Sequence, residues 1–125
     1  MAAQLIHMKT SQSVIGAFYD VHNVLGFGFL ESVYASALDI ELRARGHTVG
    51  REVPVQISYK NHRVGVHRID MIVDHVLIVE VKSTAILPPT ARRQLLNYLR
   101  GARLNVGLVL HFGPKPAVYR EIRTW

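Results

Sequence analysis

The segment 68–83, RIDMIVDHVLIVEVKS, places three charged side chains in the most apolar part of the chain. Its second half, residues 76–82, has no polar face apart from Glu80 and Lys82, and a strand that is apolar on both faces lies at the centre of a covered sheet. Burying an unpaired charge is costly. We therefore expect Asp70, Glu80 and Lys82 either to pair with one another or to share a bound cation.

The rest of the chain changes between helical and strand periodicity. Apolar residues recur every three or four positions in three segments, which predicts helices at 10–23, 30–45 and 90–101. Period-two alternation and continuous apolar runs predict strands at 51–59, 64–73, 76–82, 105–112 and 117–125. The second strand changes the phase of its apolar positions, so we expect a β-bulge or a bend near residues 67–68. The order α-α-β-β-β-α-β-β predicts an α/β (α+β) fold, a mixed central sheet flanked by helices.

The turn between the second and third strands decides whether the charged groups meet. A two-residue loop, 74–75, would leave Asp70 and Glu80 on opposite faces of the hairpin. A three-residue loop, 74–76, sets Asp70 directly opposite Glu80 and gathers the aliphatic side chains on the other face. We predict the second register, because it joins the polar groups and puts Lys82 on the same face as Glu80.

Two carboxylates and an ammonium at close range allow two interpretations. Like charges cannot both stay ionised cheaply unless a cation lies between them, and oxygen ligands of this kind suit Mg²⁺ or Mn²⁺. The lysine would then orient a water molecule or neutralise charge on a phosphorus centre. The alternative is a buried Asp–Lys–Glu ion network without catalysis. The D-x₉-E-x-K spacing alone does not decide between them.

Composition narrows the class of protein and its partners. A length of 125 residues with 49% hydrophobic residues suits one domain, 1–125, of which residues 1–9 are expected to be a disordered N-terminus. Fifteen Lys and Arg against nine Asp and Glu give a formal net charge of +6, which suits a polyanion such as nucleic acid. The chain shows no signal-peptide pattern and no apolar run near the ~20 residues of a membrane span, so we expect a cytoplasmic protein without a membrane partner.

Two motifs resemble a known family. An acid at a strand end, a hairpin and E-x-K on the next strand, within an α-β-β-β-α-β order, resemble the core of the PD-(D/E)XK nuclease superfamily, which has a restriction-endonuclease-like fold. The segment 25–34, LGFGFLESVY, resembles the signature of the GxxExxY family within it, with Gly28, Glu31 and Tyr34 in the named places. The resemblance covers nearly the whole chain from residue 10 to residue 113.

This resemblance implies a metal-dependent nuclease and a set of site residues. Asp70, Glu80, Glu31 and the main-chain carbonyl of Val81 would hold Mg²⁺ or Mn²⁺, and Lys82 would position the attacking water. A carboxylate in the first turn of a helix also interacts favourably with the helix dipole, which explains Glu31 without any function.

The third helix is the candidate nucleic-acid contact. Gln94 and Tyr98 share a helix face, and a Q-x-x-x-Y helix resembles the DNA-contacting element of related exonucleases. A solvent-facing glutamine and a core tyrosine explain the two residues equally well. Arg92 and Arg93 are candidate phosphate contacts or part of a solvated face. Gly28 and Tyr34 are expected to support the site.

The sequence therefore predicts a nuclease-like protein that hydrolyses phosphodiester bonds, with DNA as the expected nucleic acid. The alternative is a non-catalytic nucleic-acid-binding or regulatory module that keeps the same fold. A domain this small can need a homodimer or a protein partner to hold a duplex, and the edge strand 117–125, which ends in Trp125, is the candidate interface.

Overall fold

The computed structural model describes residues 6–124, so residues 1–5 and Trp125, on which the predicted N-terminus and interface partly depend, lie outside the described residues. Helices and strands follow one another in the predicted order: α1 (Met8–Leu25), α2 (Glu31–Ala44), β1 (Val49–Tyr59), β2 (His62–Val73), β3 (Leu77–Lys82), α3 (Ala91–Ala102), β4 (Val106–Phe112) and β5 (Pro116–Ile122). The predicted fold class is confirmed. None of the helices in the described part is long and apolar enough to cross a bilayer.

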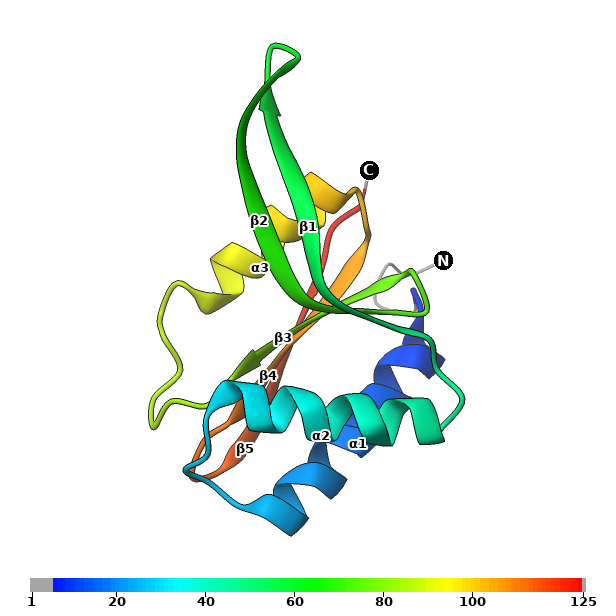
Figure 1. Cartoon of the computed structure of the whole chain (residues 1–125), viewed down its shortest axis with the longest axis vertical. Helices are drawn as coiled ribbons and strands as arrows, with labels where there is room; N and C mark the ends of the chain where they lie inside the picture. The colour runs from blue at the N-terminus through cyan, green and yellow to red at the C-terminus, as the bar shows by residue number, and fades with distance from the viewer. Residues whose placement is uncertain (1–5, 125) are drawn as a thin grey trace.

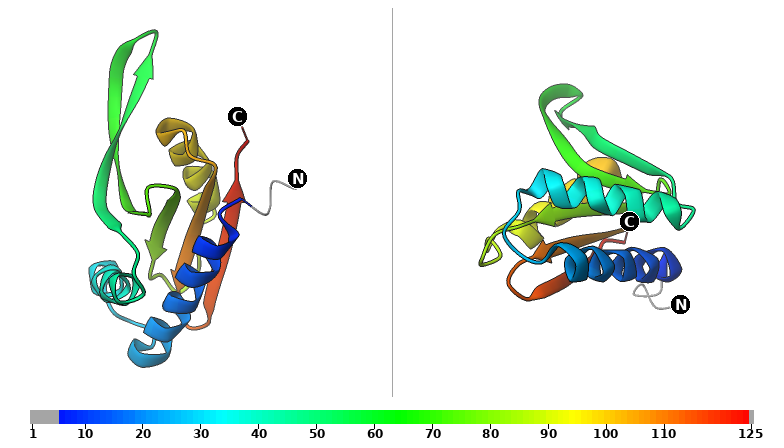
Figure 2. Two further views of the ribbon diagram at one scale, coloured as in Figure 1. Left: turned by 90° about the vertical axis from the view of Figure 1, so that its right-hand side faces the viewer. Right: turned by 60° about the horizontal axis from the view of Figure 1, so that its bottom comes forward.

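The five strands form one mixed sheet in the order β1-β2-β3-β4-β5. Neighbouring strands are antiparallel except β3 and β4, which are parallel because α3 carries the chain back across the sheet between them. Helices α1 and α2 cover one face and α3 covers the other (Figures 1 and 2). The central position predicted for β3 is confirmed, and β5 is an edge strand.

The core has two apolar layers, one on each face of the sheet. Phe18, Leu38 and Val79 belong to the layer under α1 and α2, and Ile78 and Leu95 to the layer under α3. Strand β3 thus supplies alternate side chains to both layers, which explains its continuous apolar sequence. The even-numbered positions of β3 face α3, so Glu80 and Lys82 point to that side of the sheet.

The β1–β2 ribbon turns over in its middle. Val49 packs under α1 and α2, whereas Val55 packs under α3, and on β2 the same change occurs between Met71 and Ile69. At this bend Glu52 has a φ of 49°, a left-handed conformation that is uncommon for a residue other than glycine. Strand irregularities of this kind often lie next to active sites, because they redirect side chains.

No bulge lies at residues 67–68, so that form of the prediction is wrong, but the ribbon bends close by, between Ile69 and Met71. The register shift of the β1–β2 ladder lies between Ile57 and Ser58, near the turn that joins the two strands. The prediction assumed that Val64 and Val66 face the core. They are 63% and 45% exposed, so their alternation gives no information about the buried face of the strand. They belong to the arm, residues 56–67, which projects beyond the body of the molecule in Figure 1.

Candidate active site

Asp70 and Glu80 meet where β2 and β3 separate. The ladder between these strands runs from Val73 opposite Leu77 to Met71 opposite Val79, so Asp70 and Glu80 are the next residues along it. The predicted three-residue loop and its register are therefore confirmed. Beyond the ladder, the carboxylates of these two residues, instead of main-chain carbonyls, accept the hydrogen bonds between the strands.

Each carboxylate accepts a backbone hydrogen bond from the neighbouring strand. The N–H of Asp70 donates to Oε2 of Glu80 at 2.9 Å, and the N–H of Val81 donates to Oδ2 of Asp70 at 2.8 Å. The other oxygens, Oδ1 of Asp70 and Oε1 of Glu80, accept no hydrogen bond from residues 6–124. The arrangement fixes both carboxyl groups and leaves one oxygen of each for another partner.

The electrostatic environment makes ionisation of these carboxyl groups costly. Glu80 is only 5% exposed, and its burial together with the charge of Asp70 raises its pKa to about 8, against the effect of its backbone hydrogen bond and of Lys82. Burial also raises the pKa of Asp70, although the hydrogen bond from Val81 and the charges of Lys82 and Arg51 oppose this. Among residues 6–124 no cationic side chain lies within 4 Å of either carboxyl group, and a bound cation would supply that positive charge.

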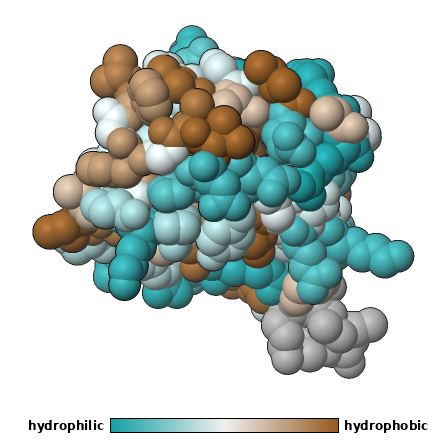
Figure 3. Space-filling model, turned by 90° about the horizontal axis from the view of Figure 1, so that it is seen from below, coloured by the Kyte–Doolittle hydropathy of each residue, from teal (hydrophilic) through white to brown (hydrophobic). Residues whose placement is uncertain are grey.

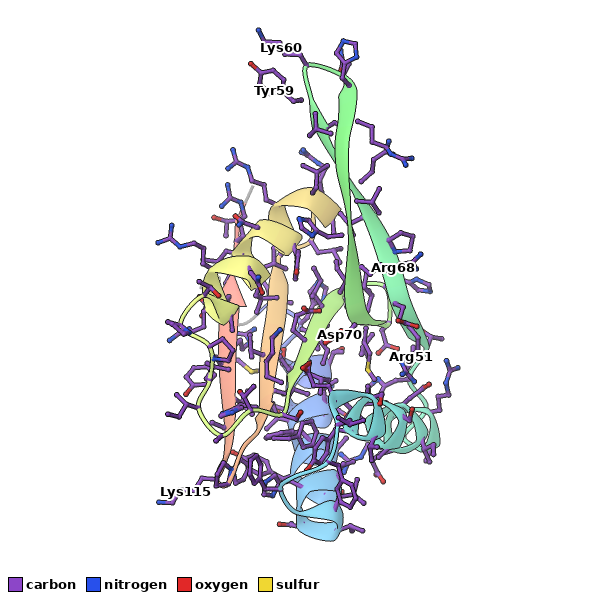
Figure 4. The ribbon with its side chains drawn as sticks, turned by 60° about the vertical axis from the view of Figure 1, so that its left-hand side comes forward. Arg51, Tyr59, Lys60, Arg68, Asp70 and Lys115 are labelled. Carbon is purple, nitrogen blue, oxygen red and sulfur yellow. The ribbon has the colours of Figure 1, made fainter. Side chains whose placement is uncertain are left out.

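Glu31 is the first residue of α2 and lines the same cleft as Asp70. Partial burial raises the pKa of its carboxyl, Lys82 counteracts the increase, and Asp70 adds to it. Glu31 and Asp70 line a cleft of about 250 Å³, together with Arg51, Glu52 and Val81. Figure 4 shows Asp70 and Arg51 at the foot of the arm, close to α2.

The pairing of acidic residues separates this cleft from the rest of the molecule. Every other acid in the described part of the chain lies within 4 Å of a cationic or histidine nitrogen: Asp20 with Arg45, Asp39 with Arg43 and Arg51, Glu41 with Arg45, Asp74 with His47, and Glu121 with Arg92. Among residues 6–124, the four acids without such an ion pair are Glu31, Glu52, Asp70 and Glu80. All four lie at or beside the cleft.

The structure does not join Glu31 to Asp70 and Glu80 as metal ligands. In residues 6–124 no three His, Cys, Asp or Glu side chains are close enough together to hold a metal ion. The two adjacent carboxylates each keep one oxygen outside the backbone bonding, and oxygen donors of this kind suit a hard divalent cation. Magnesium sites with few protein ligands complete their shell with water and substrate oxygens.

Tyr34 and two glycines fix the turn that precedes Glu31. The buried Tyr34 hydroxyl donates to the carbonyl of Gly26 and accepts from the N–H of Phe29, at 3.3 Å in the second bond. Its ring stacks on Phe112 with centroids 4.3 Å apart. Gly28 has a φ of 121°, a conformation that essentially requires glycine. The start of α2 is therefore held firmly against the sheet.

The turn held by Tyr34 also carries an apolar surface. Phe27, Phe29, Leu30 and Val33 are 38% to 75% exposed, although they are large hydrophobic side chains. Figure 3, which views the molecule from below, shows apolar atoms gathered over part of this end. This surface adjoins the cleft, because Glu31 and Ser32 line that cleft.

The predicted residues of α3 separate into two groups. Tyr98 lies near the carboxylates, since burial and then the charges of Glu80 and Asp70 raise the pKa of its hydroxyl. Gln94 is exposed one helical turn before it. Arg92 instead lies on the β5 side, where it forms an ion pair with Glu121 and packs over the ring of Tyr119, so the structure gives it a structural partner.

Sequence reasoning missed Arg51 and Glu52, which line the cleft beside Asp70. The β1–β2 register places them there, because Arg51 pairs with Met71 and Val53 with Ile69, which brings Glu52 opposite Asp70. On a strand that reads as half exposed, however, two charged residues resemble an ordinary solvent face.

Comparison with known proteins agrees with this geometry. A sequence model of the PD-(D/E)XK nuclease superfamily matches residues 8–124. The chain belongs to the PD-(D/E)XK nuclease superfamily. No curated protein and no solved structure matches it significantly. The matched range includes Asp70, Glu80 and Lys82, the residues that the sequence predicts as the motif of this superfamily.

Proposed function

We propose that this protein is a metal-dependent nuclease of the GxxExxY type that hydrolyses phosphodiester bonds in DNA. The observation that carries the proposal is the Asp70–Glu80 pair, held by backbone hydrogen bonds across two strands, with Lys82 on the same face and no ion pair to either acid among residues 6–124. A structural ion network would bring the lysine into contact with the acids.

Asp70, Glu80 and the carbonyl of Val81 are the groups that would hold Mg²⁺ or Mn²⁺. When bound, such an ion supplies positive charge that polarises the phosphate and makes water a better nucleophile. The raised pKa of Glu80, about 8, means that without a bound cation this residue favours its protonated form at neutral pH. A cation that replaces this proton restores the ionised pair.

Lys82 is proposed to act on the water or on the phosphate. Its ammonium has three donors on a flexible stem, and its place two residues after Glu80 directs it to the same side of the sheet. There it can orient the attacking water and stabilise negative charge on a phosphate oxygen. Glu31, across the cleft, can accept a hydrogen bond from the same water and fix its direction.

The turn before α2 supports the assignment to the GxxExxY type. Gly28 supplies the positive φ that the turn needs, and the Tyr34 hydroxyl bonds the main chain of the turn. Together they fix the position of Glu31 at the start of α2. The three named residues of the signature thus have connected tasks at one edge of the cleft. A loss of either support would displace Glu31 without altering the β2–β3 pair.

Cleavage assays test the proposal directly. Purified protein is incubated with linear single-stranded and double-stranded DNA, and with RNA, in Mg²⁺, Mn²⁺ or EDTA. We expect metal-dependent cleavage of DNA, and we expect Glu80→Gln and Lys82→Ala each to lower its rate by at least about a hundredfold. Glu41→Gln is the matched control, because Glu41 is an exposed acid paired with Arg45 away from the cleft. Wild-type rates in Glu80→Gln would contradict the assignment.

The non-catalytic module remains the competing function, favoured by the absence of three clustered ligands in the described residues. It predicts that the wild-type protein binds nucleic acid but cleaves none of the substrates with either ion. Binding measured beside cleavage therefore separates the two functions.

A further inference from the structure

A second cavity, a polar groove, lies between the arm and α3. It has a volume of about 570 Å³, and its lining includes Gln56 and His67 from the arm and Asn97 and Arg100 from α3. No acidic side chain lines it. The groove offers amide, imidazole and guanidinium groups, which can bind phosphates and the edges of nucleobases.

The charge of both walls has one sign. Residues 53–69, which include the whole arm, contain Lys60, Arg63 and Arg68 but no Asp or Glu, and residues 81–120, which include α3, contain no acid either. The acids of the chain are confined to the helices α1 and α2, the cleft, the β2–β3 turn and Glu121. A groove between two acid-free segments attracts a polyanion.

The groove leads to the active site through two rings. The ring of His67 on the arm lies 5.3 Å from the ring of Tyr98 on α3. His67 stands three residues before Asp70 on β2. The end of the groove at His67 therefore lies toward the carboxylate pair, with one aromatic ring on the arm and one on α3.

Another aromatic residue follows directly after Ser58, the last residue of β1 that lines the groove. Tyr59 at the tip of the arm is 63% exposed, with the ammonium of Lys60 5.4 Å from its ring centroid. Both residues project to the side of the arm on which α3 lies in Figure 4. Tyr59 is four residues beyond Val55, roughly 13 Å along the strand, which is room for about four stacked nucleotides at about 3.4 Å each.

We propose that this groove binds a single-stranded polynucleotide that runs from the active site along the arm, with its bases against Tyr98, His67 and Tyr59 and its phosphates near Arg100 and Lys60. The inference rests on the proposed nuclease function and specifies the form of its substrate. A positive groove with aromatic platforms is the arrangement by which single strands are bound without sequence preference.

A double helix fits the groove less well than a single strand. The floor is closed, since a side chain at Gly101 would come within 3.0 Å of Val55 and 3.1 Å of Ile57, so α3 and β1 are in contact there. In a duplex the bases are stacked on each other, and their faces cannot reach Tyr98 or Tyr59. A single strand presents these faces.

Fluorescence anisotropy in EDTA, where nothing is cleaved, tests the groove. The probes are a labelled 12-nucleotide oligothymidylate, an oligouridylate of the same length and a 12-base-pair DNA duplex. We expect the single strands to bind more tightly than the duplex, and Tyr59→Ala to weaken strand binding at least about fivefold through lost stacking. Lys60→Gln should lower the slope of log K against log salt by about 0.7. The DNA and RNA strands show whether the sugar matters.

Lys115→Gln is the matched control for Lys60→Gln. Both lysines are exposed at hairpin turns, but Lys115 lies at the opposite end of the molecule (Figure 4). Its replacement should leave strand affinity and salt slope unchanged. The arm variants should raise the KM for DNA cleavage, because Tyr59 and Lys60 would hold the strand, whereas Lys115→Gln should leave the KM unchanged.

The results separate this inference from the proposed function. Wild-type strand affinity in Tyr59→Ala, or equal binding of strand and duplex, overturns the groove, while metal-dependent cleavage lost in Glu80→Gln would still support the nuclease. A wild-type protein that binds no strand also overturns the groove. A protein that cleaves nothing overturns the proposed nuclease, even where the arm variants weaken binding.

Discussion

Asp70 and Asp74 stand four residues apart on the same hairpin, yet their surroundings have opposite effects. Asp74 accepts hydrogen bonds at both oxygens: Oδ2 lies 2.7 Å from Nδ1 of His47, and Oδ1 accepts the N–H of Thr48 at 2.9 Å. Burial acts to raise its pKa, but the bonds from His47 and Thr48 outweigh it, so the pKa is lowered. For Asp70 the balance is reversed and the pKa is raised.

This contrast distinguishes a structural contact from a functional site. His47 also bonds Oγ of Ser13 at 2.7 Å, so Asp74 ends a chain of hydrogen bonds that joins α1, the α2–β1 connection and the β2–β3 turn. Asp74 is stabilised as an anion by protein groups alone. The protein does not stabilise the ionised forms of Asp70 and Glu80 in this way, since the pKa of each carboxyl is raised. Residues with such strongly shifted pKa values are candidates for binding and catalysis.

The largest expected effect concerns pH and the unfolding free energy of the metal-free protein. The pKa of Glu80 is 4.5 in an ordinary setting and about 8 in the fold, so between these pH values the native state holds a proton that the unfolded chain releases. Stability should therefore fall as pH rises through this window, by an amount on the order of 4 kcal/mol. Urea denaturation in EDTA at pH 5 and pH 8 measures it.

Glu80→Gln isolates this contribution from other titrating groups. The variant keeps the shape of the side chain without the carboxyl group, so its stability should depend less on pH than that of wild type over the same window. Glu41→Gln, a change at an exposed ion pair, should follow the wild-type dependence. Parallel curves for wild type and Glu80→Gln would mean that Glu80 is not held protonated.

The next effect concerns divalent cations. An ion that binds only the folded protein stabilises it by about 2.7 kcal/mol at a hundred times its dissociation constant. We expect Mn²⁺ to raise the melting temperature of wild type but not of Asp70→Asn. Without metal, Asp70→Asn should be at least as stable as wild type, because burial makes ionisation of the Asp70 carboxyl costly and the variant has no such group. A destabilised Asp70→Asn, together with a wild type that ignores Mn²⁺, would favour the ion network instead.

The sequence predicts the Asp70–Glu80 pair because all its information is local. One hairpin with a short loop allows two registers, and alternation of apolar side chains selects between them. The continuous apolar run of β3 likewise indicates its central position. These arguments need no knowledge of how distant segments meet.

The remaining features depend on distant contacts and escape such reasoning. Glu52 reaches the cleft only because the ribbon bends at its left-handed φ, and glutamate has no preference that would reveal it. From the local sequence Arg92 is a candidate phosphate contact, because its ion pair with Glu121 of β5 forms only in the folded chain. The Ser13–His47 hydrogen bond joins residues 34 positions apart, and no motif or spacing in the sequence predicts it.

The smallest effect belongs to Asp74 and should reverse the behaviour of Asp70. Asp74→Asn removes a charge that His47 and Thr48 stabilise, so the variant should lose about 1–2 kcal/mol at pH 7, a value reduced by partial exposure. Because the pKa of Asp74 is lowered, its contribution is present above the unfolded value of 3.8 and disappears as pH falls through the folded one. The deficit should therefore shrink on acidification, and the Mn²⁺ response should stay that of wild type. Asp20→Asn, at an acid with 57% side-chain exposure, should change stability by no more than about 0.5 kcal/mol. An Asp74→Asn protein that lost its Mn²⁺ response would show that the two acids form one site.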